Sequence, residues 1–360
     1  MTGNRDCFNS RFPLTKVVAM ERQLLLLTDY KGEYWVRHRH TALTTVLQAL
    51  AEHLGGRGYK LRTLPFVALD LRSEAYRELP VLYQSSQDPG LYYKSYIEDM
   101  VLGLERAGAR LLPRFELFRA HHNKVFMEVL RDLSGLPELQ SLRARYFGTY
   151  EDLRSELHGL SYPAVLKLSE RDTSRGVELL RDEGQARQVA EKLSRSFDLG
   201  DARHNLEHKL RRDGVRPHSF HRRKLIVQDF VPGLDHDYKI VTMADRFFVM
   251  KRPAPGGDFR ASGSRIERQF PTELPEGLLD FTEKVFRHFD TPFASIDVMH
   301  DGARFYLGEI QFLRFGTGPI HRNPRHFIRQ GGDGSWTCIE GRRQWEAELA
   351  HGIATHLDRH

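Results

Sequence analysis

Cysteine and long apolar runs are both scarce in this sequence. Only two cysteines occur among its 360 residues, Cys7 and Cys338, so disulfides are excluded as the framework of the fold and a cytoplasmic, reducing setting is expected. A membrane-spanning helix needs roughly 20 apolar residues, whereas the leucine run at 24–27 is far shorter. The residues before that run lack the layout of a secretory signal. We therefore expect neither a membrane span nor secretion.

A strong excess of one charge is also absent. The 54 basic residues face 48 acidic ones, which leaves a net charge of +6 at pH 7. This mild excess does not require a nucleic-acid partner, since binding of an anionic small molecule also explains it. The basic residues concentrate in the segment 203–224, where a solvated loop is favoured over a nucleic-acid patch.

What the chain does have is the composition of an ordinary globular protein. Hydrophobic residues make up 40% and charged residues 28% of the sequence, as is usual for such proteins. Its length suffices for two or three domains with separate cores. No internal repeat interrupts it.

The first third of the chain alternates strand and helix patterns, which predicts a small α/β layer. The expected strands lie at 23–30, 59–69 and 80–83, and the expected helices at 41–54 and 93–108. The remainder mixes helices with strands and hairpins. Its expected strands and hairpins lie at 162–168, 225–231, 238–252 and 293–311, and its expected helices at 121–133, 150–157, 182–197, 278–289 and 345–357.

Three polar side chains interrupt the apolar strand pair at 293–311, namely Asp297, Glu309 and Gln311. A carboxylate inside an apolar strand is costly to bury unless something pairs with it. A divalent cation such as Mg²⁺ is a suitable partner, because it takes hard oxygen ligands and usually brings substrate phosphates. A sheet with one polar face is the alternative, and it is favoured on this stretch alone.

The turn between these two strands decides whether the polar side chains meet. A plain two-residue turn would place Asp297 and Glu309 on opposite faces. A three-residue loop at 301–303, or a bulge at Gly302, puts both on one face together with Gln311. The two carboxylates would then lie two strand positions apart, about 7 Å between α-carbons, which suits the binding of one or two metal ions.

Two lysines lie at positions suited to binding phosphates. Lys167 is near the end of an apolar strand, and Lys124 begins a predicted helix. The small-residue segment 173–176 follows Lys167 and can place backbone donors over phosphates. Taken singly, each lysine is better explained as an apolar stem that carries its charge to the surface.

A strand and two arginines further on carry groups suited to a nucleotide. The strand end Gln228–Val231 offers backbone groups to a purine, and Asp237 offers a carboxylate to ribose hydroxyls. Arg252 and Arg260 follow, and a guanidinium in the Gly- and Ser-rich loop around Arg260 can reach a phosphate or an acyl phosphate. For each piece alone the plain alternative is an ordinary strand, a polar turn or a solvated arginine.

The order and spacing of all these groups resemble those of the ATP-grasp superfamily. Within it they resemble the carboxylate–amine ligases related to glutathione synthetase, D-alanine–D-alanine ligase and the glutamate-adding ligases. The resemblance covers about residues 120–320. It implies an α/β (α+β) ATP-grasp fold, in which two subdomains clasp ATP between antiparallel sheets after a small α/β domain. The implied divisions are a leader at 1–22, an N-terminal α/β domain at 23–120, a small subdomain at 121–228 and a large subdomain with the metal site at 229–360.

Carried over residue by residue, the resemblance implies three sets of roles. The nucleotide would be held by Lys124, Lys167, Gln228, Asp229, Phe230, Val231 and Asp237, with Asp235 as a competitor for the ribose. The transferred phosphoryl group and an acyl phosphate would be steadied by Arg252 and Arg260. Mg²⁺, or Mn²⁺ in its place, would be bound by Asp297, Glu309 and Gln311.

Four positions depart from the family pattern. Gln311 and Ser262 stand where the family has asparagine, the phosphate loop is reduced to 173–176, and Arg314-Phe315 replaces a Pro-Gly pair.

The implied function is an ATP-dependent carboxylate–amine ligase that releases ADP and forms a peptide-type bond through an acyl phosphate. Its partners would be a small-molecule or peptide carboxylate and an amine, with no membrane or nucleic acid, and a homodimer is the default assembly. An ATP-grasp kinase that phosphorylates a hydroxyl and an inactive nucleotide-binding protein are the alternatives.

Overall fold

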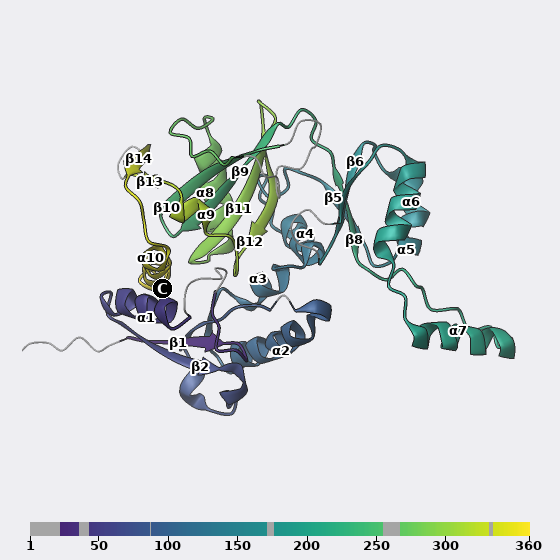
Figure 1. Ribbon diagram of the computed structural model, residues 1–360, viewed down its shortest axis with the longest axis horizontal. Coiled ribbons are helices and arrows are strands. Elements are labelled where there is room, and N and C mark those ends of the chain that lie inside the picture. Colours follow the sequence, from purple (N-terminus) through teal and green to yellow (C-terminus); the bar gives the residue numbers. More distant parts are fainter. Residues whose placement is uncertain (1–21, 36–42, 87, 171–175, 255–266, 331–333) are drawn as a thin grey trace, which may run out of the picture.

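Three β-sheets organise the chain in the computed structural model (Figure 1). The structure describes residues 22–35, 43–86, 88–170, 176–254, 267–330 and 334–360. The sheets follow one another along the sequence, and each has its own covering helices. Within the described ranges no helix is long and apolar enough to cross a membrane.

The first sheet is parallel, with strand order β2-β1-β3-β4. Its strands are β1 (Arg22–Thr28), β2 (Tyr59–Pro65), β3 (Pro80–Leu82) and β4 (Arg110–Leu112), and its main helices are α1 (Leu43–Gly55) and α2 (Tyr92–Arg106). The four leucines of β1 are all buried and alternate between two hydrophobic clusters. A continuous apolar run is typical of a parallel strand that is covered on both faces. The expected α/β layer is present.

The second sheet is antiparallel, with order β5-β8-β6-β7. Its strands are β5 (Ala144–Phe147), β6 (Ala164–Leu168), β7 (Val177–Leu180) and β8 (Leu225–Asp229). Helices α5 (Tyr150–Glu156) and α6 (Glu183–Ser194) pack on one face through Leu166, Leu168 and their neighbours. Because side chains alternate along a strand, Lys167 and Gln228 are placed on the other face.

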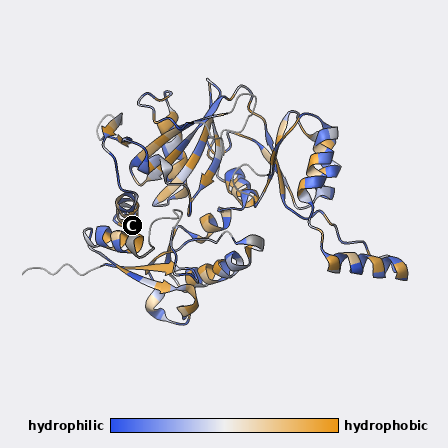
Figure 2. Ribbon diagram, in the orientation of Figure 1, coloured by the Kyte–Doolittle hydropathy of each residue, from blue (hydrophilic) through white to orange (hydrophobic). Residues whose placement is uncertain are grey.

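A helix occupies part of the basic segment that the sequence suggested was a solvated loop. It is α7 (Leu199–Arg211), which has no buried residue and projects away from the second sheet (Figure 1). Apolar residues occur along it (Figure 2), and Leu199 and Leu210 are exposed. The loop interpretation was therefore wrong for these residues. Asp198 stabilises the start of the helix by accepting hydrogen bonds from the amides of Gly200 and Asp201.

The third and largest sheet is antiparallel, with order β12-β11-β9-β10-β13-β14. Its strands are β9 (His236–Met243), β10 (Arg246–Pro253), β11 (Phe293–His300), β12 (Phe305–Gln311), β13 (Arg325–Arg329) and β14 (Trp336–Glu340). The hairpin expected at 238–252 is confirmed, with its turn at Ala244-Asp245. Strands β13 and β14 were not anticipated. Helix α8 (Leu278–Phe289) covers one face.

The remaining helices connect these layers. They are α3 (Phe115–Ala120), α4 (Lys124–Leu133), α9 (Gly318–His321) and α10 (Trp345–Leu357), with short 3₁₀ turns at Phe66–Ala68, Glu74–Tyr76, Pro89–Leu91 and Leu157–Gly159. Helix α4 lies against β5 and β8, and α10 packs against α1.

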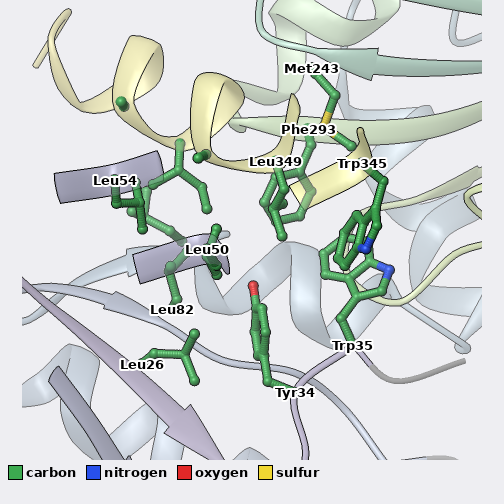
Figure 3. Close-up of a cluster of buried hydrophobic side chains, with 14 of the residues drawn as sticks. Leu26, Tyr34, Trp35, Leu50, Leu54, Leu82, Met243, Phe293, Trp345 and Leu349 are labelled. Carbon is green, nitrogen blue, oxygen red and sulfur yellow. The ribbon is translucent and has the colours of Figure 1, made fainter. Parts of the chain in front are cut away.

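One hydrophobic cluster joins the first sheet to the third (Figure 3). At its centre the indole of Trp35 lies 5.0 Å from the ring of Phe293, 4.8 Å from Phe315 and 5.4 Å from Trp345, measured between ring centroids. Trp35 comes from the N-terminal part, whereas its three aromatic neighbours come from the C-terminal part. The cluster thus fixes the first sheet against the strand β11.

Removal of the Trp35 indole tests the packing of the first sheet against β11. We expect Trp35→Ala to lower the free energy of unfolding by about 3–5 kcal/mol, because it leaves a cavity among three aromatic rings. Tyr30→Ala is the control, since the Tyr30 side chain is 71% exposed, and it should cost less than about 1 kcal/mol. Chemical denaturation measures both, and equal losses would contradict the central position of Trp35.

Candidate active site

The strand pair β11–β12 brings Asp297, Glu309 and Gln311 to one face of the third sheet. Asp297 lies directly opposite Glu309, and Gln311 lies opposite Ser295. Residues that face each other across an antiparallel pair point to the same side. The expectation that the three share a face is therefore confirmed. The expected two-position offset is wrong, because the two carboxylates are direct cross-strand neighbours.

A bulge within strand β12, and not in the turn, aligns Asp297 with Glu309. His300 pairs with Phe305, so the loop has four residues, and the register shifts by one residue at Gly308. A β-carbon at Gly308 would lie 3.2 Å from the backbone oxygen of Asp297, which is tighter than most real contacts. Glycine permits this close approach. The extra residue restores Glu309 to the face of Asp297.

A buried arginine bridges two carboxylates beside this pair. Arg252 donates to both oxygens of Asp237, at 2.6 and 2.5 Å, and its Nη2 also lies 2.8 Å from Asp297 Oδ2. Lys239 Nζ donates to Asp297 Oδ1 at 3.3 Å. Burial alone would raise the pKa of Asp297, but Arg252 and Lys239 hold that pKa below its ordinary value. Asp297 is thus held as an anion between two cations.

The two candidate lysines reach the same carboxylate from outside the third sheet. Lys124 begins α4, where Asn123 caps the helix by accepting from the Phe126 amide, and its Nζ lies 3.6 Å from Glu309 Oε1. Lys167 lies on β6 and also interacts electrostatically with Glu309. Two lysines and one carboxylate, from three different elements, therefore meet where the second and third sheets face each other.

The environment of Lys167 perturbs its titration strongly. Its Nζ donates to Gln228 Oε1 at 2.6 Å. Burial lowers the pKa of Lys167 to about 8, against the opposing effects of Glu128 and Glu309. A buried lysine whose charge is sustained by nearby carboxylates is a typical feature of functional sites.

Sequence reasoning missed Glu128, which stabilises the charge of this lysine, and Arg131, which pairs with Glu128. Arg131 Nη1 donates to Glu128 Oε1 at 3.1 Å, and Arg131 Nε donates to the Leu139 backbone oxygen at 2.8 Å. Both side chains are buried. Opposite charges three residues apart on an apolar helix face were the available signal.

The strand end proposed to hold a purine is shorter than expected, because β8 ends at Asp229. Gln228 is 2% exposed, and its Nε2 has no hydrogen-bond partner among the residues that the structure describes. Asp229 is exposed, Phe230 is half-buried and Val231 is buried. A buried amide with an unused donor costs free energy unless a ligand satisfies it.

Asp237 and its competitor Asp235 lie in different surroundings. Asp237 is mostly buried against Arg252. Asp235 is 86% exposed along its side chain, and its carboxylate lies beside the neighbouring His236. Arg260 lies outside the described residues, as do Ser262 and residues 173–175 of the phosphate loop.

Sequence reasoning also missed Arg268. It interacts electrostatically with Arg252, Asp237 and Arg322, and burial together with the two arginines lowers its pKa. Its neighbour Gln269 pairs with Lys251 of β10, which places this segment beside the site. Arg268 thus lies near two other arginines and one carboxylate, an arrangement that favours a further anion.

Comparisons with known proteins identify the fold. No family model matches the sequence, and no curated protein matches it. Among solved structures, a RimK-domain ATP-grasp protein from Sphaerobacter thermophilus is similar with a TM-score of 0.52 and 15% identity, over 93% of this chain and 98% of that one. The D-cycloserine synthetase DcsG is similar with a TM-score of 0.53 and 12% identity, over 93% and 99% of the two chains.

The ADP complex of PurK, an N5-carboxyaminoimidazole ribonucleotide synthetase, is similar with a TM-score of 0.52 and 12% identity, over 96% of this chain and 99% of that one. The chain has the ATP-grasp fold. The resemblance inferred from the order of its motifs is therefore confirmed at the level of fold.

The residues on the shared face also fit the metal that this fold implies. Asp297, Glu309 and Gln311 offer only oxygen donors, which Mg²⁺ prefers over nitrogen or sulfur. Glu309 has 41% of its side chain exposed, so it is accessible to an incoming ligand. The longer Gln311 arm carries the same amide oxygen as asparagine.

Removal of the bridging arginine should reveal how strongly the site is coupled to stability. We expect Arg252→Met to lower the free energy of unfolding by about 3–5 kcal/mol, because Asp237 and Asp297 then remain buried without their partner. Arg287→Met is the matched control, since Arg287 pairs with Glu283 but is 68% exposed, and exposed pairs contribute at most about 1 kcal/mol. Denaturant titration would contradict the account if both variants lost the same amount.

Proposed function

We propose that this protein is an ATP-dependent ligase that joins a carboxylate to an amine through an acyl phosphate. The observation that carries the proposal is the meeting of Lys124 and Lys167 at Glu309. Two cationic side chains and one carboxylate suited to a metal ion thus lie between two sheets. The phosphates of a bound nucleotide require both cationic side chains and a metal ion. The ATP-grasp fold supports the assignment of ATP as the phosphoryl donor.

The nucleotide is held by groups on both sheets in this proposal. Residues Gln228, Asp229, Phe230 and Val231 contact the adenine, and the unused Nε2 donor of Gln228 supports a polar ligand at this place. Lys124 and Lys167 neutralise the phosphates. Asp237, expected at the ribose, has both carboxylate oxygens bonded to Arg252 beside Asp297, so its competitor, the exposed Asp235, is assigned to the ribose side instead.

Mg²⁺ would be held by Asp297, Glu309 and Gln311, and when bound it neutralises charge on the β- and γ-phosphates. The chain's own cations act on the same charge. Lys167 and Arg252 face the transferring phosphoryl group, and Arg260 is assigned to the acyl phosphate. Such fixed charges stabilise a loose phosphoryl-transfer transition state by electrostatics and positioning.

Arg268 and Arg322 extend this cationic region beyond Arg252. We assign them to the carboxylate of the first substrate, because guanidinium groups bind carboxylates in two-point contacts. The carboxylate attacks the γ-phosphate, ADP leaves, and the amine then displaces phosphate from the acyl phosphate. The bond that forms last is the C–N bond, and the amine proton passes to solvent or to the departing phosphate.

Hydroxylamine offers a direct test, because it is a small amine that captures acyl phosphates as hydroxamates. We expect ADP, phosphate and a hydroxamate when the protein is mixed with Mg-ATP, hydroxylamine and a panel of amino acids, dipeptides and other carboxylic acids. Glu309→Ala should reduce ADP formation by at least about a hundredfold, since one preorganised electrostatic contact is worth that much. Glu340→Ala, on the far strand β14 with Glu340 65% exposed, should leave the rate unchanged. Full activity in Glu309→Ala would contradict the metal assignment.

A hydroxyl in place of the carboxylate would make the protein a kinase, which the arginines around Asp237 do not exclude. The same assay separates the two reactions. A kinase yields a stable phosphorylated product without free phosphate, whereas the proposed ligase releases phosphate in step with ADP.

The depressed pKa of Lys167 predicts a pH dependence of nucleotide binding. Phosphates bind the protonated lysine, and in the free protein this lysine loses its proton near pH 8. Affinity for Mg-ADP should therefore fall as the pH rises above 8, by at most about tenfold per unit. Calorimetric titrations between pH 7 and pH 9.5 measure it.

Lys167→Gln should bind Mg-ADP weakly and with a flat pH profile, because the titrating group is gone. Lys124→Arg should keep the slope of the wild type. A wild-type profile that is flat across this range would contradict the role of Lys167.

A further inference from the structure

Three side chains of types that can bind a metal meet at the end of α10, outside the residues assigned to the candidate active site. His356 lies in the last turn of α10, His360 follows one turn later, and Asp290 ends α8. Their ligating atoms all lie within 4.8 Å of one another. Asp290 Oδ1 lies 3.2 Å from His360 Nε2 and 3.8 Å from His356 Nδ1.

Two of these separations are close to those of a tetrahedral metal site. With metal–ligand bonds of about 2.1 Å, ligand atoms of a tetrahedral zinc site are about 3.4 Å apart. The separations of 3.2 and 3.8 Å lie on either side of that value, and the third separation is at most 4.8 Å. Octahedral neighbours would be about 3.0 Å apart at the same bond length.

His360 Nε2 and Asp290 Oδ1 lie within hydrogen-bond distance of each other, and a bound metal ion would replace this contact. His356 is buried. At 3.8 Å its contact with Asp290 is too long for a hydrogen bond.

Access and anchoring are both provided. The side chains of Asp290 and His360 are 55% and 43% exposed, whereas that of His356 is only 10% exposed. Asp290 has a positive φ of 44° and its amide donates to the Arg287 backbone oxygen at 3.2 Å. His356 is therefore held by packing and Asp290 by the backbone at the end of a helix. His360 reaches the other two from the solvent side.

We propose that His356, His360 and Asp290 bind Zn²⁺, with water in the fourth position. Two imidazoles and one carboxylate are a known ligand set for this ion. The ion would fasten the end of α10 to the corner that leads into β11. Because β11 carries Asp297 and α10 packs against α1, this corner links the first sheet to the strand of the candidate active site. The proposal is independent of the ATP chemistry.

Zinc binding by the full-length chain without an affinity tag tests the proposal. We expect calorimetric titration with Zn²⁺ at pH 7 to show a micromolar or tighter site that is lost in His360→Ala and weakened at least roughly tenfold in Asp290→Asn. Asparagine tolerates positive φ, so Asp290→Asn changes the ligand and keeps the turn. Co²⁺ should give the strong visible absorption of tetrahedral coordination in the wild type only.

His288→Ala is the control, since His288 is exposed and lies two residues from Asp290, and it should bind zinc as the wild type does. Other histidines cluster near α7, where the rings of His204 and His218 stack. Because these histidines could also bind zinc, the proposal is judged by the loss of one equivalent of bound zinc from the wild type to the variant. Identical zinc stoichiometry and affinity in the wild type, His360→Ala and Asp290→Asn would overturn the proposal, as would a Co²⁺ spectrum unchanged by either substitution.

Discussion

Arg252 is the residue on which the charged face of the third sheet depends. It lies on β10, yet it binds Asp237 on β9 and Asp297 on β11. Without it, two carboxylates would be buried side by side on neighbouring strands, where like charges repel and water cannot screen them. Lys239 adds the second positive charge. The face can therefore hold acids within an apolar sheet, and the same charges are suited to phosphoryl transfer.

On the second sheet, across the site, the buried charge is positive and its partners are carboxylates. Lys167 is a buried cation on β6, and Glu128 and Glu309 offset the cost of its burial. Glu309 comes from the third sheet, so the charge of one wall is completed by the other. This mutual dependence explains why two sheets with separate apolar cores present their polar faces to each other. A nucleotide with its metal would replace these direct contacts by contacts through phosphate oxygens.

Much of this arrangement could be predicted from the sequence, because it rests on local patterns. Apolar runs placed β1, β6 and the two hairpins of the third sheet, and the order of the charged residues indicated the fold. The bulge at Gly308 could not be placed, since one extra residue in a strand is decided by its partner strand. Arg268 was missed because its neighbours are distant in sequence. The pairing of Glu128 with Arg131 is local, but its effect on Lys167 depends on a distant strand. Strands β13 and β14 lacked a clear alternation, and α7 has no buried face to mark it.

A crystal structure with Mg²⁺ and a non-hydrolysable ATP analogue is the most direct test of the central claim. The account predicts adenine beside Gln228–Val231, phosphates between Lys124 and Lys167, and metal bound by Asp297, Glu309 and Gln311. Electron density for the nucleotide elsewhere, or metal bound without Asp297 and Glu309, would contradict it.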